Sequence, residues 1–218
     1  MVHVLPHWNW EGMEGKKIPV FSYTNCDEVE LFVNGKSHGK KIKGIDKTPI
    51  PINFIDWEGG RYQGDFMSPY RLHWNVPYEA GELKVIGYID GKKVTEKQIN
   101  TAKKPAKIEL VPDRNLIKSD REDMSFVTVR ILDIEGNLCP NSENLVEFEL
   151  KGEGEIVAVG NGNPATTELF QSNQRKAFSG QCMVYIKASS SPGEIILKAK
   201  SDGLEGADIT IQSEKVTN

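Results

Sequence analysis

The chain has 218 residues, of which 38% are hydrophobic and 27% are charged, and its formal net charge is -4 at pH 7. This composition is typical of a globular protein with a sizeable core, and it excludes global disorder and a collagen-like helix. The lysines are scattered and form no basic stripe, so we expect neither nucleic acid nor an acidic membrane surface as a principal partner. No apolar run approaches the roughly 20 residues of a membrane-spanning helix, and the start of the chain lacks the features of a signal peptide.

Short β-branched and aromatic runs between turn residues predict an all-β protein, because no stretch sustains the apolar spacing of a helix. In the first half, strands are expected at 17–23, 28–33, 36–42, 83–89 and 94–101. Asn34-Gly35 and Asp90-Gly91 each connect two of these strands. Both pairs tolerate the positive φ angles of a type I′ turn, so we predict two tight hairpins.

A long excursion, residues 47–71, separates the two hairpins and carries aromatic residues among glycines and prolines. Long ordered loops often carry function. Trp57, Tyr62 and Tyr70 are therefore our candidate substrate-binding residues, and a place in the core is the alternative for each of them.

A polar run closed by a proline, residues 102–105, is expected to link two domains, 1–102 and 103–218. Beyond it, strands are expected at 106–111, 125–133, 145–150, 155–160, 181–188, 194–200 and 207–212. Short strands at this spacing are typical of an immunoglobulin-like sandwich, although the Cys, Trp and Cys pattern of antibody domains is missing. The sequence thus predicts an all-β protein of two tandem immunoglobulin-like β-sandwich domains.

Paired carboxylates are the first candidates for catalysis. Glu28 with Glu30, and Glu147 with Glu149, would each share one face of a strand. These acids alternate with apolar residues, which is typical of the solvated face of a half-buried strand and not of an acid in a pocket. Motifs for a serine or cysteine nucleophile and for a phosphate-binding loop are absent. We therefore assign no catalytic residue.

Metal and cofactor sites find no support in the spacing of potential ligands. The cysteines are Cys26, Cys139 and Cys182. The histidines are His3, His7, His38 and His73. Neither set has the spacing of a zinc site, and we expect the cysteines to be buried as small hydrophobic residues. Residues 160–164 (GNGNP) favour a turn at a sandwich edge over a calcium or phosphate loop. We expect no metal and no cofactor.

Trp8 and Trp10 flank Asn9 and would lie on one face of a strand. Two hypotheses fit this spacing: the rings are anchors of the core, or they form a platform on which a sugar ring stacks. We favour the core, because tryptophan is highly buried on average.

Specific segments of the chain carry a family resemblance: 5–10 (LPHWNW), 23–37, 74–78 with 81–83, and 160–164. They resemble the region that follows the catalytic barrel in bacterial glycoside hydrolases of family 2, the β-galactosidase type. The resemblance implies that residues 1–102 are the sandwich next to the barrel and that residues from 103 onward are an immunoglobulin-like domain, similar to those of invasin and intimin. In that family the catalytic glutamates belong to the barrel, so none carries over to this chain.

The resemblance implies a non-catalytic accessory region of an enzyme that hydrolyses O-glycosyl bonds in carbohydrate metabolism. We expect it to be part of a longer chain, to buttress the barrel, to shape the substrate cleft and to be inactive alone. Its partner would be the barrel of the parent chain, and a parent like bacterial polysaccharide-degrading enzymes would be periplasmic or secreted. A carbohydrate-binding module that uses the aromatic residues of 47–71 and an adhesin-like pair of immunoglobulin domains are the alternatives.

Two departures from the family pattern stand out. Residues 47–67 of the excursion are longer than the usual connection, which leaves open whether the aromatic loop reaches the substrate cleft. Residues 102–105 (AKKP) replace a pattern more often written with glycine before lysine and proline, which affects only the stiffness of the linker.

Overall fold

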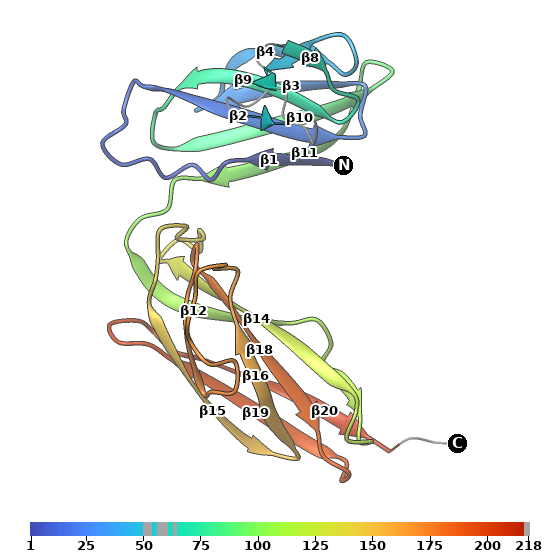
Figure 1. The fold of residues 1–218 in the computed structure, drawn as a ribbon, viewed down its shortest axis with the longest axis vertical. Coiled ribbons are helices and arrows are strands. Elements are labelled where there is room, and N and C mark those ends of the chain that lie inside the picture. The colour runs from blue at the N-terminus through green and yellow to red at the C-terminus, as the bar shows by residue number, and fades with distance from the viewer. Residues whose placement is uncertain (50–53, 56–60, 63–64, 216–218) are drawn as a thin grey trace. The chain divides into compact units, whose positions relative to one another are not determined.

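The computed structural model describes residues 1–49, 54–55, 61–62 and 65–215, and its regular elements are all strands. The expected all-β class is therefore confirmed. The chain divides into two compact units, Met1–Thr101 and Ala102–Asn218 (Figure 1). Each unit is a sandwich of two sheets around a hydrophobic core of its own. The residues that the structure describes contain no helix that could cross a membrane.

In the first unit a three-stranded sheet packs against a four-stranded one. The first sheet has the order β1-β2-β9, with the bounds Val2–Leu5, Lys17–Thr24 and Arg71–Pro77. The second has the order β11-β10-β3-β4, with the bounds Lys92–Asn100, Glu82–Ile89, Glu28–Val33 and Lys36–Ile42. All pairs in both sheets are antiparallel.

Short strands lie in the excursion between β4 and β9. Strand β5 pairs with β8, and β6 pairs with β7. Their bounds are Lys47–Pro49, Phe54–Ile55, Arg61–Tyr62 and Asp65–Met67, in chain order. Thr48 is buried, and its hydroxyl donates a hydrogen bond to the carbonyl of Arg71 at 3.0 Å. The excursion is thus tied to β9.

The core of the first unit follows from the period of two along its strands. In β3 the buried residues Val29, Leu31 and Val33 alternate with Glu28, Glu30 and Phe32, which are half-buried. Because successive side chains of a strand point to opposite faces, this alternation turns one face of the sheet to the core and the other outward. The same pattern holds along β2 and β10.

Both predicted hairpins of the first unit are present. Asn34 and Gly35 have φ angles of 49° and 77°, and Asp90 and Gly91 have 49° and 71°. Positive φ at both central residues is the requirement of a type I′ turn, whose twist matches that of the flanking strands. The first turn joins β3 to β4 and the second joins β10 to β11.

The second unit is a sandwich of four and five strands. One sheet has the order β12-β14-β18-β16, with the bounds Pro105–Pro112, Met124–Asp133, Gln181–Ala188 and Gly154–Gly160. The other has the order β13-β20-β19-β15-β17, with the bounds Leu116–Lys118, Ala207–Glu214, Gly193–Lys200, Leu145–Gly152 and Gln174–Lys176. Only β13 and β20 run parallel among these pairs. The arrangement agrees with the expected immunoglobulin-like sandwich.

Candidate functional site

Of the three candidate substrate-binding residues, the structure describes the side chain of one. Tyr70 is 70% exposed, and its backbone is anchored because its carbonyl accepts a hydrogen bond from the amide of Thr24 at 2.9 Å. Tyr62 lies in β7 opposite Phe54. Trp57 lies outside the described residues. Whether the three rings form one site therefore stays a prediction.

The outer face of the sheet β1-β2-β9 lies next to Tyr70 and was not singled out by the sequence. In the strand register Tyr23 lies opposite both His3 and Arg71, and in the next row Phe21 lies opposite Leu5 and His73. Part of this outer face consists of His3, Leu5, Phe21, Tyr23, Arg71 and His73, and we call these six residues the aromatic face. Leu5 is 44% and Tyr23 is 37% exposed.

Close contacts order the middle of the aromatic face. The ring centroids of Phe21 and His73 are 4.9 Å apart, and the guanidinium carbon of Arg71 lies 5.0 Å from the centre of the Phe21 ring. A cation held over the flat side of an aromatic ring is attracted by the ring quadrupole. His73 is buried, and Phe21 and Arg71 are half-buried. The apolar groups that the aromatic face exposes are therefore mainly Leu5 and Tyr23, beside the Arg71 charge. This chemistry suits either another protein surface or a sugar ring.

The segment that carries the two neighbouring tryptophans is built into the first sandwich. Trp8 is fully buried, its indole nitrogen donates to the carbonyl of Glu79 at 3.0 Å, and its ring meets Tyr78 edge-on at 5.2 Å. Trp10 is half-buried, donates to the carbonyl of His7 at 2.9 Å and stacks on the His7 ring. Burial lowers the pKa of His7. The hypothesis that these tryptophans belong to the core is confirmed for Trp8. Because Trp8 is buried, the two rings cannot together form a platform for a sugar.

The carboxylates of β3 are engaged in surface pairs. Glu28 lies 3.0 Å from the ammonium of Lys40. Glu30 accepts hydrogen bonds from the Ser37 hydroxyl at 2.6 Å and from the Tyr88 hydroxyl at 3.1 Å. Glycoside hydrolysis requires one acid that stays protonated in a pocket and a second carboxylate across the sugar bond. These pairs do not supply such an arrangement.

The carboxylates of β15 are also on the surface. Glu147 and Glu149 are both exposed, and Glu149 forms an ion pair with Lys151 at 3.1 Å. The hydrogen bond from Lys151 lowers the pKa of Glu149. A general acid requires a shift in the opposite direction. The expectation that these glutamates form a solvated strand face agrees with their exposure.

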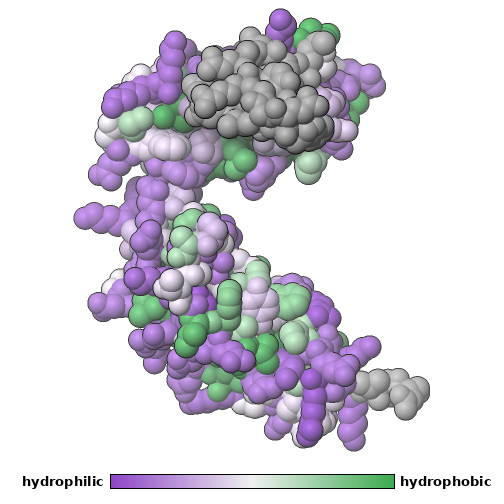
Figure 2. All heavy atoms as spheres, in the orientation of Figure 1, coloured by the Kyte–Doolittle hydropathy of each residue, from purple (hydrophilic) through white to green (hydrophobic). Residues whose placement is uncertain are grey.

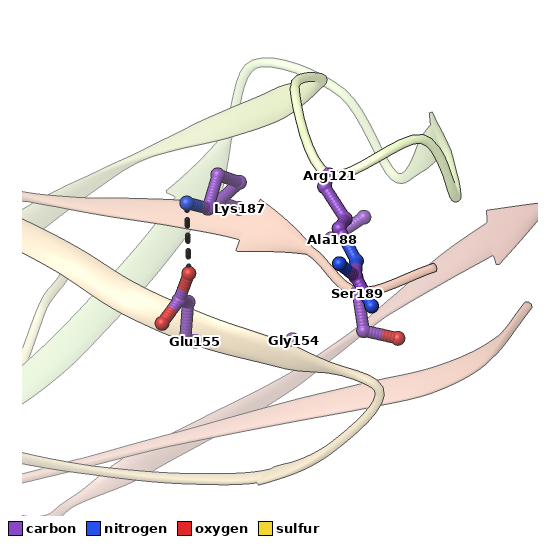
Figure 3. A pocket seen from close by; sticks show the side chains of 6 residues that line it. All are labelled: Arg121, Gly154, Glu155, Lys187, Ala188 and Ser189. Carbon is purple, nitrogen blue, oxygen red and sulfur yellow. Dashed lines mark ion pairs between the residues drawn. The ribbon is translucent and has the colours of Figure 1, made fainter. Parts of the chain in front are cut away.

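A shallow depression of about 390 Å³ lies on the second unit (Figure 3). Its lining residues are Arg121, Gly154, Glu155, Lys187, Ala188 and Ser189. Figure 3 shows Lys187 and Glu155 facing each other from neighbouring strands, and their charged groups are 2.8 Å apart. The Ser189 hydroxyl donates to the Glu153 carboxylate at 2.8 Å. No imidazole lines the depression, and its one lining carboxylate, Glu155, is paired with Lys187 and not with Ser189. The depression therefore offers no nucleophile with its base.

The three cysteines are free and buried, as the sequence predicts. Burial raises the pKa of Cys139 to about 11 and that of Cys182 to about 12. A thiol in this state is a poor nucleophile, because the thiolate is the reactive form. Among the residues that the structure describes, no group of three or more His, Cys, Asp or Glu side chains could hold a metal ion.

Two family models match the chain, one in each unit. Residues 108–210 match the model described as glycoside hydrolase family 2 C-terminal domain 5. Residues 15–95 match a domain of unknown function, DUF4982. The two matches fall on either side of the division between the units.

Curated relatives match almost the whole chain, while the chain covers only a small part of each of them. The β-galactosidase BoGH2A of Bacteroides ovatus is 43% identical over 99% of this chain and 23% of its own length. A protein named putative β-glucuronidase from Formosa agariphila is 36% identical over 89% of this chain and 17% of its own length. The chain thus spans less than a quarter of the length of these relatives.

Solved structures also match almost the whole chain, and the chain again covers only a small part of each of them. A glycosyl hydrolase family 2 member from Bacteroides cellulosilyticus matches with a TM-score of 0.77 and 36% identity, over 97% of this chain and 24% of its own. A β-glycosidase from Bacteroides vulgatus matches with a TM-score of 0.81 and 30% identity, over the same shares of the two chains, 97% and 24%.

Proposed function

We propose, from the premise that this chain belongs to the C-terminal region of glycoside hydrolase family 2, that it is a non-catalytic accessory region of a longer enzyme of the β-galactosidase type. Its two sandwiches would buttress the catalytic barrel of that enzyme. The barrel of the same polypeptide is thus the proposed partner, and the substrate is a glycoside bound and cleaved there.

The aromatic face is the observation that carries this proposal. The core of the first unit is already closed by Trp8, Tyr78 and the inward side chains of both sheets. Leu5 and Tyr23 nevertheless remain exposed on the outer face. Full burial of a large apolar side chain contributes about 1.5–3 kcal/mol, and partial burial contributes less, in proportion to the area removed from water. Contiguous exposed apolar side chains are a feature of interaction surfaces, and this pair is consistent with one.

Activity assays test the absence of catalysis. The isolated chain should release no nitrophenol from nitrophenyl β-galactoside, whereas the full-length enzyme should release it. A rate that scales with the concentration of the isolated chain and survives removal of host enzymes would refute the proposal.

A substitution on the aromatic face tests the buttress itself. Tyr23→Lys should lower the melting temperature of the full-length enzyme more than that of the isolated chain, because only the full-length enzyme would bury the part of this side chain that is still exposed. Val94→Lys is the matched control, since Val94 is 51% exposed on the edge strand β11 of the other sheet. Equal effects of Tyr23→Lys on both proteins would contradict the role of the aromatic face.

Carbohydrate binding through Trp57, Tyr62 and Tyr70 is the second candidate, and the high exposure of Tyr70 favours it. Stacking on a single ring gives weak affinity. Titration of the isolated chain with galactosides and plant oligosaccharides, followed by NMR, would detect it. Tyr70→Ala should then weaken binding, and a loop shortened across 50–67 should abolish it.

A further inference from the structure

The loop 161–173 of the second unit exposes two adjacent apolar side chains. It connects β16 to β17, and Leu169 is 77% and Phe170 is 62% exposed. On the side of the second unit that Figure 2 shows, hydrophobic residues lie among hydrophilic ones. Single exposed apolar residues are ordinary, but two neighbours at this exposure on one ordered loop need a reason.

A fully buried arginine holds this loop. The Nη2 atom of Arg175 donates to the carbonyl of Val159 at 2.7 Å and to that of Leu169 at 2.8 Å. Its Nη1 atom lies 3.5 Å from the carboxylate of Glu168. The Nε atom of Arg175 is buried and has no hydrogen-bond partner among the residues that the structure describes. Burying a guanidinium group costs free energy. In return, the hydrogen bonds of Arg175 fix the position of the loop backbone.

Further contacts fix the same end of the loop. The amide of Val159 donates to the carbonyl of Phe170 at 2.8 Å, which joins the loop to the end of β16. The amide of Lys176 donates to the Glu168 carboxylate at 3.2 Å. The guanidinium carbon of Arg175 lies 5.3 Å from the centre of the Phe170 ring. The two exposed side chains are therefore presented by a preorganised backbone, which lowers the entropic cost of binding.

We propose that the loop 161–173 is a docking element, with Leu169 and Phe170 as its anchors and Arg175 as its positioning residue. Its occupant is the part of the same polypeptide that lies outside this chain. This inference rests on the proposed function, and it adds a second contact to the one that the aromatic face would make.

The size of the apolar pair fits a tethered occupant better than a free partner. A stable complex of two free proteins buries about 800 Å² on each partner. An aromatic side chain buries about 150–250 Å². A leucine and a phenylalanine together therefore supply well under the area that each partner of a free complex buries. A contact of this size suffices when both surfaces belong to one chain, because a linker sets an effective concentration in the millimolar range. The relatives offer such a tether, since the chain spans only 23% of the length of BoGH2A.

Hydrogen exchange followed by mass spectrometry tests the docking element. The full-length enzyme and the isolated chain are compared under the same conditions. We expect the amides of residues 165–172 to exchange about tenfold more slowly in the full-length enzyme, because docking excludes water from the loop. In the full-length enzyme, Arg175→Met should remove this protection.

Two further variants separate docking from folding. The double variant Leu169→Ser with Phe170→Ser changes only exposed side chains, and it should also remove the protection of 165–172 while the amides of β14 and β18 exchange as before. Ile134→Ser is the control, because Ile134 is 68% exposed in a turn of the same unit. It should leave the protection of 165–172 intact.

Each remaining outcome overturns the inference in a recognisable way. Equal exchange of 165–172 in both proteins refutes it. If the strands of the aromatic face are protected in the full-length enzyme and the loop is not, the inference fails and the proposed function stands. If neither is protected, both fail. Protection that appears in the isolated chain with rising concentration, or only on adding galacto-oligosaccharides, identifies a second copy or a carbohydrate as the occupant and also overturns it.

Discussion

Asp133 organises the turn after β14 through one buried carboxylate. It is fully buried and accepts hydrogen bonds from the amides of Lys103, Glu135 and Asn137 at 2.8, 2.9 and 2.8 Å. Burial alone would raise the pKa of Asp133, but these hydrogen bonds outweigh it and the pKa is lowered. The ionised form is thus stabilised by the fold.

Asp133→Asn should lower the free energy of unfolding of the second unit by about 2 kcal/mol at pH 7, because an amide NH₂ would face backbone donors. Since the folded pKa lies below the unfolded value of about 3.9, the wild-type advantage is complete above that pH and declines as the pH falls through the folded value. Urea denaturation at pH 7 and pH 3 measures this difference. Glu135→Gln, which alters an exposed partner of Lys103, should cost less than about 1 kcal/mol. A variant with a constant deficit at both pH values would contradict the argument.

The buried thiols make a second prediction at this scale. At pH 8 the native chain should not react with Ellman's reagent within an hour, because burial keeps Cys139 and Cys182 protonated and inaccessible. In guanidinium chloride the three cysteines of the chain should all react. Rapid labelling of any thiol in the native chain would indicate an opening that the structure does not contain.

Among the elements, the hairpins illustrate what local sequence can specify. Asn34-Gly35 and Asp90-Gly91 adopt the expected positive φ angles, a conformation that both residues of each pair tolerate. Strand β9, Arg71–Pro77, was not expected as a strand, although Leu72, Trp74 and Val76 alternate as buried residues. Its Asn75 and Pro77 have low strand propensity, and pairing with β2 overrides it. Strands β13 and β17 have three residues each, too few to show a period of two.

Gly35→Ala tests the strain of the first hairpin. A side chain at Gly35 would meet no atom within 4 Å, so its cost arises from the φ angle of 77°. We expect a loss of about 1–2 kcal/mol in the stability of the first unit. Gly162→Ala is the control, because its φ lies outside the left-handed region and its added Cβ would lie 3.7 Å from Phe178, an ordinary contact distance. Equal effects of the two substitutions would show that φ does not determine the cost.

At the scale of the whole molecule, the sequence predicts the class of fold better than the candidate surface. Phe21 and Tyr23 lie in a strand that the sequence predicts, but their neighbours on the aromatic face come from β1 and β9. Which strands flank β2 is decided by long-range pairing, and no local signal carries that information. The docking element was missed for a similar reason, since an arginine in a short strand gives no sign that it will be buried.

Each unit closes a core from its own residues only: the first core uses residues up to Ile99, and the second begins at Ala102. We therefore expect the two units to fold separately.

Leu31→Ala and Leu197→Ala each empty a fully buried site, one per unit, and each should cost about 2–5 kcal/mol. In calorimetry of the isolated chain, Leu31→Ala should lower one transition and Leu197→Ala the other. The fragments 1–101 and 102–218 should reproduce those transitions, with Val94→Lys as a surface control that moves neither by more than a few degrees. If either core substitution lowers both transitions together, the units form one cooperative body, and a buttress made of two separate sandwiches is the wrong description.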